Sequence, residues 1–382
     1  MAQPDLPSSM KAQVITAFNT PYTLITTPLP SLDSPSSSPH DLLIKVSAAS
    51  YCHTDAVLAA GQMPPYPLSF PHIGCHEFAG TVISSSPNSP EFPPGTRVGV
   101  PGRSFHPCGH CFECSTAPDS ANPDSDPPGY SVYCPVSINN GISGPGGFRE
   151  YAVVDARQVT PIPDGLTAVD TAVLMCAGVT VYAALRRCGL EKRRRVAIMG
   201  CGGGLGHLGL QFAAKMGYKV IGVDVKDEPL ALARDIAKTA TETRIVDARV
   251  EEAADLVAQL GEEDQKTHRG DMGVDAVIIL PESQRAFDYG VALLRNHGKC
   301  VVVSFPEKGF HVSARDVVFR DISVAGSLVG SNKVLGEMLA FAAEHGVRAR
   351  IKTFSLARLN HLVEEYHKGE GGKLVVDMEL ED

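Results

Sequence analysis

Four cysteines are grouped in one short region of the chain. Cys108, Cys111 and Cys114 follow one another with two residues between each pair, and Cys134 is the next cysteine along the sequence. Thiolates at this spacing can face one tetrahedral zinc ion, and four of them leave no open coordination position. The group therefore predicts a structural zinc site. A zinc module that binds nucleic acid is the alternative, but the acidic stretch between the last two cysteines would repel phosphate.

A glycine-rich stretch, Gly200 to Gly206, follows an apolar run and precedes a helical pattern. Glycines let the backbone turn tightly and approach a pyrophosphate, and the helix N-terminus offers free N–H groups. Asp224 stands at the end of the next apolar run, where a carboxylate accepts hydrogen bonds from a ribose and repels a 2′-phosphate. We therefore expect a dinucleotide site that favours NAD, with NADP as the alternative. The residues expected to contact the cofactor are Gly202, Gly203, Gly204, Leu205 and Asp224.

The elements that must position these groups change in character along the chain. The first 165 or so residues contain short apolar runs separated by Pro, Gly and Ser, which predicts β-structure with long loops. From about residue 170, helical patterns alternate with apolar runs, which is typical of a parallel sheet covered on both faces. We predict an α/β protein in which a Rossmann doubly wound parallel sheet domain accompanies a mostly β domain. The expected segments are 1–168 with the zinc lobe at about 103–136, then 169–316, and finally 317–382, which returns to the first domain through a strand at 373–377.

The composition narrows the class of protein. The 382 residues include 34 Lys and Arg against 43 Asp and Glu, a net charge of −9. This acidic balance argues against a nucleic-acid or anionic-membrane binder. The apolar runs are strand-sized, whereas a bilayer span needs about 20 residues, and the N-terminus lacks a secretory signal pattern. We expect a cytoplasmic protein with no nucleic-acid or membrane partner.

Several other residues could do chemistry but are ordinary when taken one at a time. They are Cys52, the adjacent His76 and Glu77, and Cys176. An isolated cysteine or histidine is more often a buried packing residue than a ligand. Spacing alone does not join these residues into one site.

The chain resembles the zinc-containing medium-chain alcohol dehydrogenases, most closely the yeast-like branch of microbial and fungal members. The matching stretches occur in family order and cover nearly the whole chain. They are residues 52–55, 76–80, the cysteines from Cys108 to Cys134, 174–182 and 200–206. The resemblance implies that the mostly β domain is a GroES-like catalytic domain.

The resemblance also implies roles for individual residues. Cys52, His76 and Cys176 would bind a catalytic zinc with an open fourth position, so that each chain holds two Zn²⁺ ions. Thr54 would exchange a proton with the substrate, and Asp55 would orient a ligand imidazole. Glu77 would be an alternate ligand, His53 and Lys373 would face the cofactor pyrophosphate, and Met63 and Tyr66 would line the substrate pocket.

The expected function is a zinc-dependent alcohol dehydrogenase or aldehyde reductase that transfers a hydride between an alcohol carbon and nicotinamide. Two alternatives remain open: an NADPH-dependent aldehyde or ketone reductase of a fungal natural-product pathway, and a non-catalytic nucleotide-binding descendant of the fold. The resemblance also implies a homodimer or homotetramer. An insert at 115–128 lengthens the zinc lobe.

Overall fold

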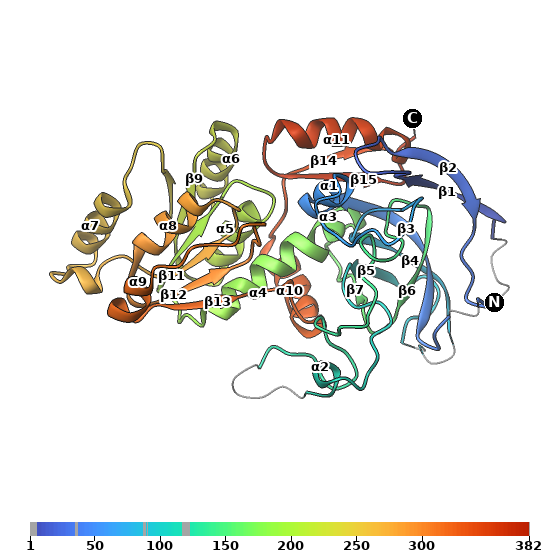
Figure 1. Cartoon of the computed structure of the whole chain (residues 1–382), viewed down its shortest axis with the longest axis horizontal. Helices are drawn as coiled ribbons and strands as arrows, with labels where there is room; N and C mark the ends of the chain where they lie inside the picture. Colours follow the sequence, from blue (N-terminus) through green and yellow to red (C-terminus); the bar gives the residue numbers. More distant parts are fainter. Residues whose placement is uncertain (1–5, 35–36, 87–88, 90, 117–122, 382) are drawn as a thin grey trace.

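The computed structural model describes all residues except 1–5, 35–36, 87–88, 90, 117–122 and 382. Two units lie side by side (Figure 1). One is built on a six-stranded parallel sheet and the other on a seven-stranded, mostly antiparallel sheet. After the expectations from the sequence, we call the first the cofactor domain and the second the catalytic domain.

The cofactor domain has the strand order β10-β9-β8-β11-β12-β13. Alternate residues of its strands face opposite layers, so Ile198 packs with the helices α4 and α5, whereas Met199 packs with α7 and α8. Burial on both faces explains why the central strands of this sheet are mostly apolar. The strands are β8 (Arg195–Met199), β9 (Lys219–Asp224), β10 (Thr243–Asp247), β11 (Val274–Ile279), β12 (Leu294–Val302) and β13 (Ser323–Gly326). The helices are α4 (Val179–Cys188), α5 (Gly206–Lys215), α6 (Asp227–Ala237), α7 (Ala253–Glu263), α8 (Gln284–Leu293) and α9 (Ala314–Arg320).

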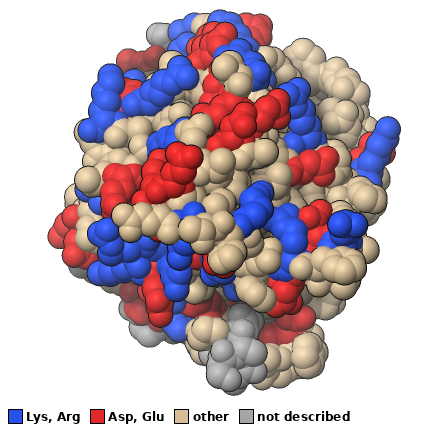
Figure 2. Space-filling model, turned by 90° about the vertical axis from the view of Figure 1, so that its left-hand side faces the viewer, with Lys and Arg blue, Asp and Glu red and all other residues tan. Residues whose placement is uncertain are grey.

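The cofactor domain differs from the sequence prediction at two places. β13 pairs with β12, so the sheet extends beyond the boundary expected at 316. β10 was not predicted, because its residues are mostly half-buried and mix polar with apolar types. On the face shown in Figure 2, acidic and basic side chains are interspersed. Ion pairs of this kind in the domain include those of Arg244 with Glu251 and Glu263.

The catalytic domain has the strand order β14-β15-β3-β4-β5-β7, with β6 also paired to β3 and a separate β1-β2 hairpin. β15 pairs antiparallel with β3, so the C-terminal segment rejoins the first part of the chain. The strands are β1 (Ser9–Val14), β2 (Thr23–Pro28), β3 (Asp41–Tyr51), β4 (Glu77–Ser85), β5 (Arg97–Pro101), β6 (Tyr151–Asp155), β7 (Thr160–Pro161), β14 (Ile351–Phe354) and β15 (Lys373–Asp377). The other helices are α1 (His53–Ala59), α2 (Phe112–Ser115), α10 (Asn332–His345) and α11 (Leu359–Lys368).

A continuous helical stretch, Ala168–Cys188, joins the two domains. It consists of α3 (Ala168–Val173), a π-helical turn (Leu174–Gly178) and α4. α3 packs against β3 and β4, whereas α4 packs against β11 and β12. By length and composition this stretch could cross a membrane, but 72% of its most apolar window is buried inside the protein, as in a core helix. The sequence analysis expected apolar runs of strand length only, and this longer apolar helix was not recognised there.

Candidate active site

Cys52, His76 and Cys176 come together where β3, β4 and the π-helical turn meet. Cys52 is the N-cap residue of α1, His76 directly precedes β4, and Cys176 lies within the turn. Their ligand atoms all lie within 4.8 Å of one another. Two thiols and an imidazole are a donor set that suits zinc, and three protein ligands leave a fourth position for another group.

Asp55 fixes the orientation of the ligand residues. Its Oδ1 lies 3.4 Å from Nδ1 of His76, and its carboxylate accepts hydrogen bonds from the backbone N–H groups of Cys52 (2.9 Å) and Cys75 (3.0 Å). A carboxylate at Nδ1 keeps the proton there and leaves Nε2 free for a metal. Thr54 lies beside this group, with its Oγ1 4.0 Å from Sγ of Cys52.

The electrostatics of the three residues favour a thiolate at Cys52. A hydrogen bond from the Cys176 thiol and the nearby imidazole of His76 lower the pKa of Cys52 despite its burial. Burial by itself would lower the pKa of His76, but Asp55 and Cys52 outweigh it and raise that pKa. The thiolate is the form of cysteine that binds zinc, so Cys52 is suited to a donor role.

Glu77 and Lys373 form a buried ion pair beside the three ligands. Glu77 also accepts hydrogen bonds from Ser50 Oγ (2.9 Å) and from the N–H of Ala177 (3.3 Å), while the Lys373 ammonium donates to the carbonyl of Tyr51 (2.9 Å). Burial raises the pKa of Glu77 to about 7, against the opposing effect of Lys373. The ammonium of Lys373 is therefore directed to a carboxylate, whereas the stem of this side chain lies beside the glycine loop.

The four clustered cysteines also meet within 4.8 Å. Sγ of Cys134 lies 3.8 Å from Sγ of Cys108, which is about the edge of a tetrahedron with Zn–S bonds of about 2.3 Å. Backbone N–H groups donate to Sγ of Cys108 (3.3 Å) and Cys111 (3.4 Å), and such bonds lower the pKa of Cys108 to about 6. The long spacing before Cys134 thus permits a closed four-thiolate arrangement.

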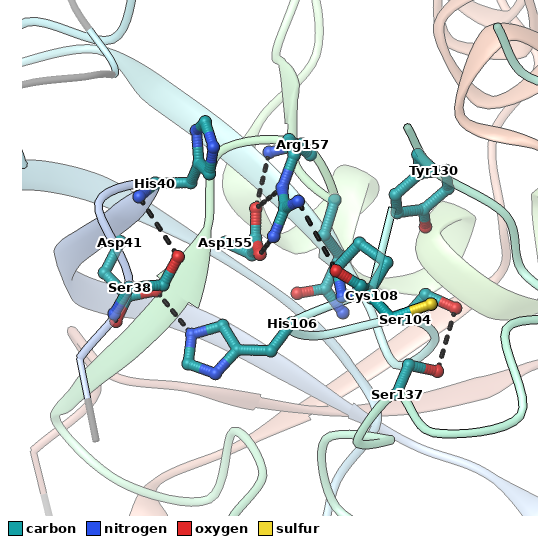
Figure 3. Close-up of polar contacts among 12 residues, drawn as sticks. Ser38, His40, Asp41, Ser104, His106, Cys108, Tyr130, Ser137, Asp155 and Arg157 are labelled. Atoms are coloured by element: carbon teal, nitrogen blue, oxygen red, sulfur yellow. Dashed lines mark hydrogen bonds and ion pairs between the residues drawn. The ribbon is translucent and has the colours of Figure 1, made fainter. Parts of the chain in front are cut away.

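Ion pairs to the buried carboxylates of Asp41 and Asp155 anchor this lobe to the catalytic sheet (Figure 3). Arg157 donates to both carboxylate oxygens of Asp155 (2.9 and 2.6 Å) and to the carbonyl of Pro107 (3.4 Å), next to the first cysteine. His106 lies 2.7 Å from Asp41. Asp41, His106 and Asp155 resemble a metal-binding group by distance, but these contacts already pair their carboxylates, so we interpret the group as an anchor.

The described end of the insert joins the lobe to the cofactor domain. Asp126 accepts hydrogen bonds from the N–H groups of Asn332 (3.1 Å) and Lys333 (3.0 Å), at the N-terminus of α10. Asp124 pairs with Arg186 of α4, which also contacts Glu337. Residues 117–122 of the insert lie outside the described residues.

The glycine loop connects β8 to α5, and the structure separates the roles of its glycines. A Cβ at Gly202 would lie 2.0 Å from the carbonyl oxygen of Pro229, so only glycine fits this close approach. At Gly203 and Gly204 the nearest atoms would be 3.4 and 3.3 Å away, so these two positions are less enclosed. The N–H of Gly202 donates to Asp224 (3.0 Å). This geometry fits a dinucleotide phosphate at the start of α5.

His207 supports the loop from the first turn of α5. It is fully buried, its Nδ1 lies 2.9 Å from the carbonyl of Gly203, and its Nε2 accepts the N–H of Arg350 at 3.2 Å. Burial lowers the pKa of His207 to about 4. Between about pH 4 and pH 6.5 the imidazole of His207 is therefore neutral in the folded protein, whereas it is protonated in the unfolded chain.

We expect this histidine to make stability depend on pH. Unfolding takes up a proton between the unfolded pKa of about 6.5 and the folded value, so the free energy of unfolding falls as pH drops through this window. Between pH 7.5 and 5.5 the loss should be about 1 kcal/mol. His207→Gln, whose amide can make both hydrogen bonds, should lack this component in urea melts at the two pH values. An identical pH dependence in both proteins would contradict the assignment.

His53 lies at the border between the two domains. Its Nδ1 is 2.7 Å from the hydroxyl of Tyr366 on α11, and its Nε2 is 3.8 Å from Glu282, just after β11. The side chain is 57% exposed. It is therefore accessible from the cofactor-domain side.

A cavity lies beside His76 and Cys176. Met63 and Tyr66, expected there from the resemblance, are not among its lining residues; they form a turn after α1 in which Tyr66 N–H donates to the Met63 carbonyl (2.9 Å). Part of the wall comes from residues that no sequence pattern marked, because they lie in loops of the zinc lobe (Arg103, Tyr130 and Val132) or on α10 (Asn332 and Leu335). The lining residues are His76, Pro101, Gly102, Arg103, Tyr130, Val132, Ile142, Met175, Cys176, Val179, Val329, Gly330, Asn332 and Leu335.

The structure combines two groups of potential zinc donors with a domain built on a parallel sheet and a glycine loop. This combination is typical of a zinc-dependent dehydrogenase with two domains. Family models agree with both halves. Residues 38–164 match the alcohol dehydrogenase GroES-like domain, and residues 204–344 match the zinc-binding dehydrogenase domain.

Individual relatives extend the match to the whole chain. An alcohol dehydrogenase of Geobacillus stearothermophilus is 33% identical over 97% of this chain and 99% of its own length. Alcohol dehydrogenase 2 of Emericella nidulans is 30% identical over 99% of this chain and 100% of its own length. The solved alcohol dehydrogenase of Aeropyrum pernix is 26% identical, has a TM-score of 0.78, and aligns over 96% of this chain and 99% of its own. The chain belongs to the zinc-containing medium-chain alcohol dehydrogenase family, whose members use zinc and a nicotinamide cofactor, and it is a zinc-dependent alcohol dehydrogenase.

Proposed function

We propose that this alcohol dehydrogenase holds its catalytic zinc with Cys52, His76 and Cys176, holds a second zinc with the four lobe cysteines, and uses NAD. The observation that carries the proposal is the convergence of two thiols and an imidazole on one point at the wall of a cavity. Small-molecule alcohols or aldehydes are the substrates that the family implies. Packing alone does not require these three residue types, which argues against a non-catalytic descendant.

Different residues of the chain have different roles around the substrate. When bound, zinc supplies Lewis acidity to the substrate oxygen and the nicotinamide exchanges a hydride with the substrate carbon. Thr54 can accept or return the substrate hydroxyl proton, because its Oγ1 lies beside Cys52 and a hydroxyl both donates and accepts. Asp55 holds His76 in place, and the buried Glu77–Lys373 pair fixes the backbone at Tyr51 and Ala177. The apolar walls of the cavity exclude water.

The preference for NAD rests on Asp224. Its carboxylate is placed at the end of β9 by hydrogen bonds from the N–H groups of Gly202 and Val225. A 2′-phosphate at this point would meet a like charge, which costs several kcal/mol. The NADPH-dependent reductase remains the second candidate, because a zinc-binding dehydrogenase of Sinorhizobium meliloti that is 25% identical, with a TM-score of 0.78 over 97% of this chain and 100% of its own, was solved bound to NADP.

Asp224→Asn should weaken the discrimination against NADP. The amide keeps an acceptor for the Gly202 N–H but removes the charge, so the ratio of kcat/KM for NAD over NADP should fall at least about tenfold. Initial rates with a primary alcohol and each cofactor give the ratio. Asp255→Asn, an exposed change on α7, is the matched control and should leave it unchanged. A wild-type preference for NADP would favour the reductase instead.

Assembly and location are further parts of the proposal. We propose a cytoplasmic homodimer or homotetramer that forms through the edge strand β13. This strand has a partner on one side within the chain, and the neighbouring α9 exposes Val318 and Phe319 (71% and 78%). Unpaired strand edges with apolar neighbours favour association.

A further inference from the structure

The substrate cavity contains a charged side chain that the reaction itself does not require. Arg103, in the loop after β5, lines the same cavity as the ligands His76 and Cys176. Most of the other side chains in the wall are apolar, including Val132 and Leu335. The wall of the cavity therefore combines two residues of the zinc-type site, mostly apolar side chains and one arginine.

The backbone of Arg103 and one of its side-chain nitrogens are already fixed. Nε donates to the carbonyl of Val132 (2.9 Å), and the Arg103 carbonyl accepts from Tyr130 Oη (3.2 Å) and Gln158 Nε2 (2.9 Å). The first contact holds the guanidinium at Nε and the other two hold the backbone, and no described residue accepts a hydrogen bond from the two terminal nitrogens. A fixed, planar donor pair is what a carboxylate binds best.

Among the described residues, no carboxylate forms an ion pair with Arg103. The ionisable neighbours that affect its pKa are the phenols of Tyr130, Tyr133 and Tyr66, and burial lowers that pKa. Asp126 lies near Tyr130, but its carboxylate is held by the N-terminus of α10. The positive charge of Arg103 is therefore not neutralised by the part of the chain that the structure describes.

A second arginine of the same region shows the usual arrangement. The guanidinium of Arg157 binds the buried carboxylate of Asp155 through two hydrogen bonds, so its charge is neutralised within the protein. Arg103 and Arg157 are both held against backbone carbonyls of the zinc lobe. They differ in the ion pair, which only Arg157 makes among the described residues.

Arg103 is partly buried, and a cation that loses part of its contact with water is stabilised by a partner of opposite charge. A guanidinium that has no carboxylate partner among the described residues, on a residue at the wall of a substrate cavity, therefore favours a ligand that brings the opposite charge. We infer that the substrate carries a carboxylate, so that the enzyme acts on an oxo acid or hydroxy acid whose reacting oxygen faces Cys52, His76 and Cys176 and whose carboxylate binds Arg103. The inference rests on the proposed function of this site and adds the substrate class.

The test compares aldehydes that differ only in this charge. Glyoxylate, 4-oxobutanoate and 6-oxohexanoate, each against its methyl ester, span several distances between aldehyde and carboxylate. For at least one chain length, wild-type kcat/KM should be at least about tenfold higher for the acid than for the ester, which corresponds to about 1.4 kcal/mol. Arg103→Gln, whose amide can still donate to the Val132 carbonyl, should reduce this ratio to near one. Arg187→Gln, an exposed change on α4, should leave the ratio unchanged.

The outcomes separate the inference from the proposed function. A wild-type preference for the ester at every chain length would overturn the inference, and so would an acid preference that survives in Arg103→Gln. Turnover of the esters in either case would leave the alcohol dehydrogenase assignment intact. If no acid, ester or simple aldehyde is turned over with either cofactor, the proposed function fails and the inference fails with it. Zinc content of Arg103→Gln equal to that of the wild type would show that a lost ratio does not come from a collapsed lobe.

Discussion

Cys176→Ser should lose at least about a thousandfold in kcat and one of two zinc ions per chain. Lewis-acid activation by zinc contributes several kcal/mol to the transition state, and each 1.36 kcal/mol corresponds to about a factor of ten in rate. Serine is a poor replacement because its hydroxyl stays protonated at neutral pH, whereas the cysteine ligand binds as a thiolate. Elemental analysis of protein purified without chelator gives the zinc count, and alcohol oxidation with NAD gives the rate.

The matched control is Cys188→Ser, which changes the same atom in a buried residue at the end of α4. Cys188 donates to the carbonyl of Ala184 (3.3 Å) and belongs to none of the metal-type groups among the described residues. This variant should keep two zinc ions and most of the activity. If Cys176→Ser retained both zinc ions and full turnover, the three-ligand site would be wrong.

Cys114→Ser should have the opposite profile, with a large loss of stability and a smaller loss of activity. Cys114 is fully buried within the four-thiolate group, and a structural zinc contributes directly to the folding free energy. Losing it should destabilise the lobe by several kcal/mol, visible as a lower melting temperature and as rapid proteolysis within 103–136. The catalytic zinc should remain, so the zinc count should fall from two to one.

Activity should still fall in Cys114→Ser, because the lobe provides Arg103, Tyr130 and Val132 to the substrate cavity. We expect kcat/KM to drop about tenfold or more, since small displacements of positioning groups have effects of this size. Cys300→Ser, in the buried strand β12, is the control for a lost thiol. A wild-type melting temperature together with one zinc per chain would contradict a structural role for the lobe metal.

The strongest local patterns identify the chemistry from short stretches of sequence. The Cys108–Cys111–Cys114 spacing and the glycine loop followed by Asp224 depend on residues close together along the chain, so their geometry is set by short segments of backbone. The apolar runs in β8, β9, β11 and the last part of β12 were also readable, because strand residues buried on both faces are mostly apolar. The less buried β10 lacked that signal.

The group of Cys52, His76 and Cys176 could not be predicted from local sequence patterns, because it forms through contacts between distant segments. Cys52, His76 and Cys176 lie on three separate elements, and no local pattern determines that β3, β4 and the π-helical turn meet. The resemblance to a family supplied this grouping, and the packing of α3 against β3 and β4 gives its physical cause. The resemblance did not supply the partner of Lys373, which the fold sets against Glu77.

By itself the sequence determined the fold class, the closed four-cysteine group and the dinucleotide loop, because each is encoded within a short stretch of chain or in the period of its apolar residues. Only the tertiary structure decided which walls enclose the substrate. Arg103 and Tyr130 come from the zinc lobe, and Leu335 from α10, and the contact of Asp126 with the N-terminus of α10 joins these segments. The shape of the cavity depends on such contacts between segments that are distant in the sequence. These contacts form because folding buries apolar surface and pairs charges across the molecule, and local backbone preference does not determine them.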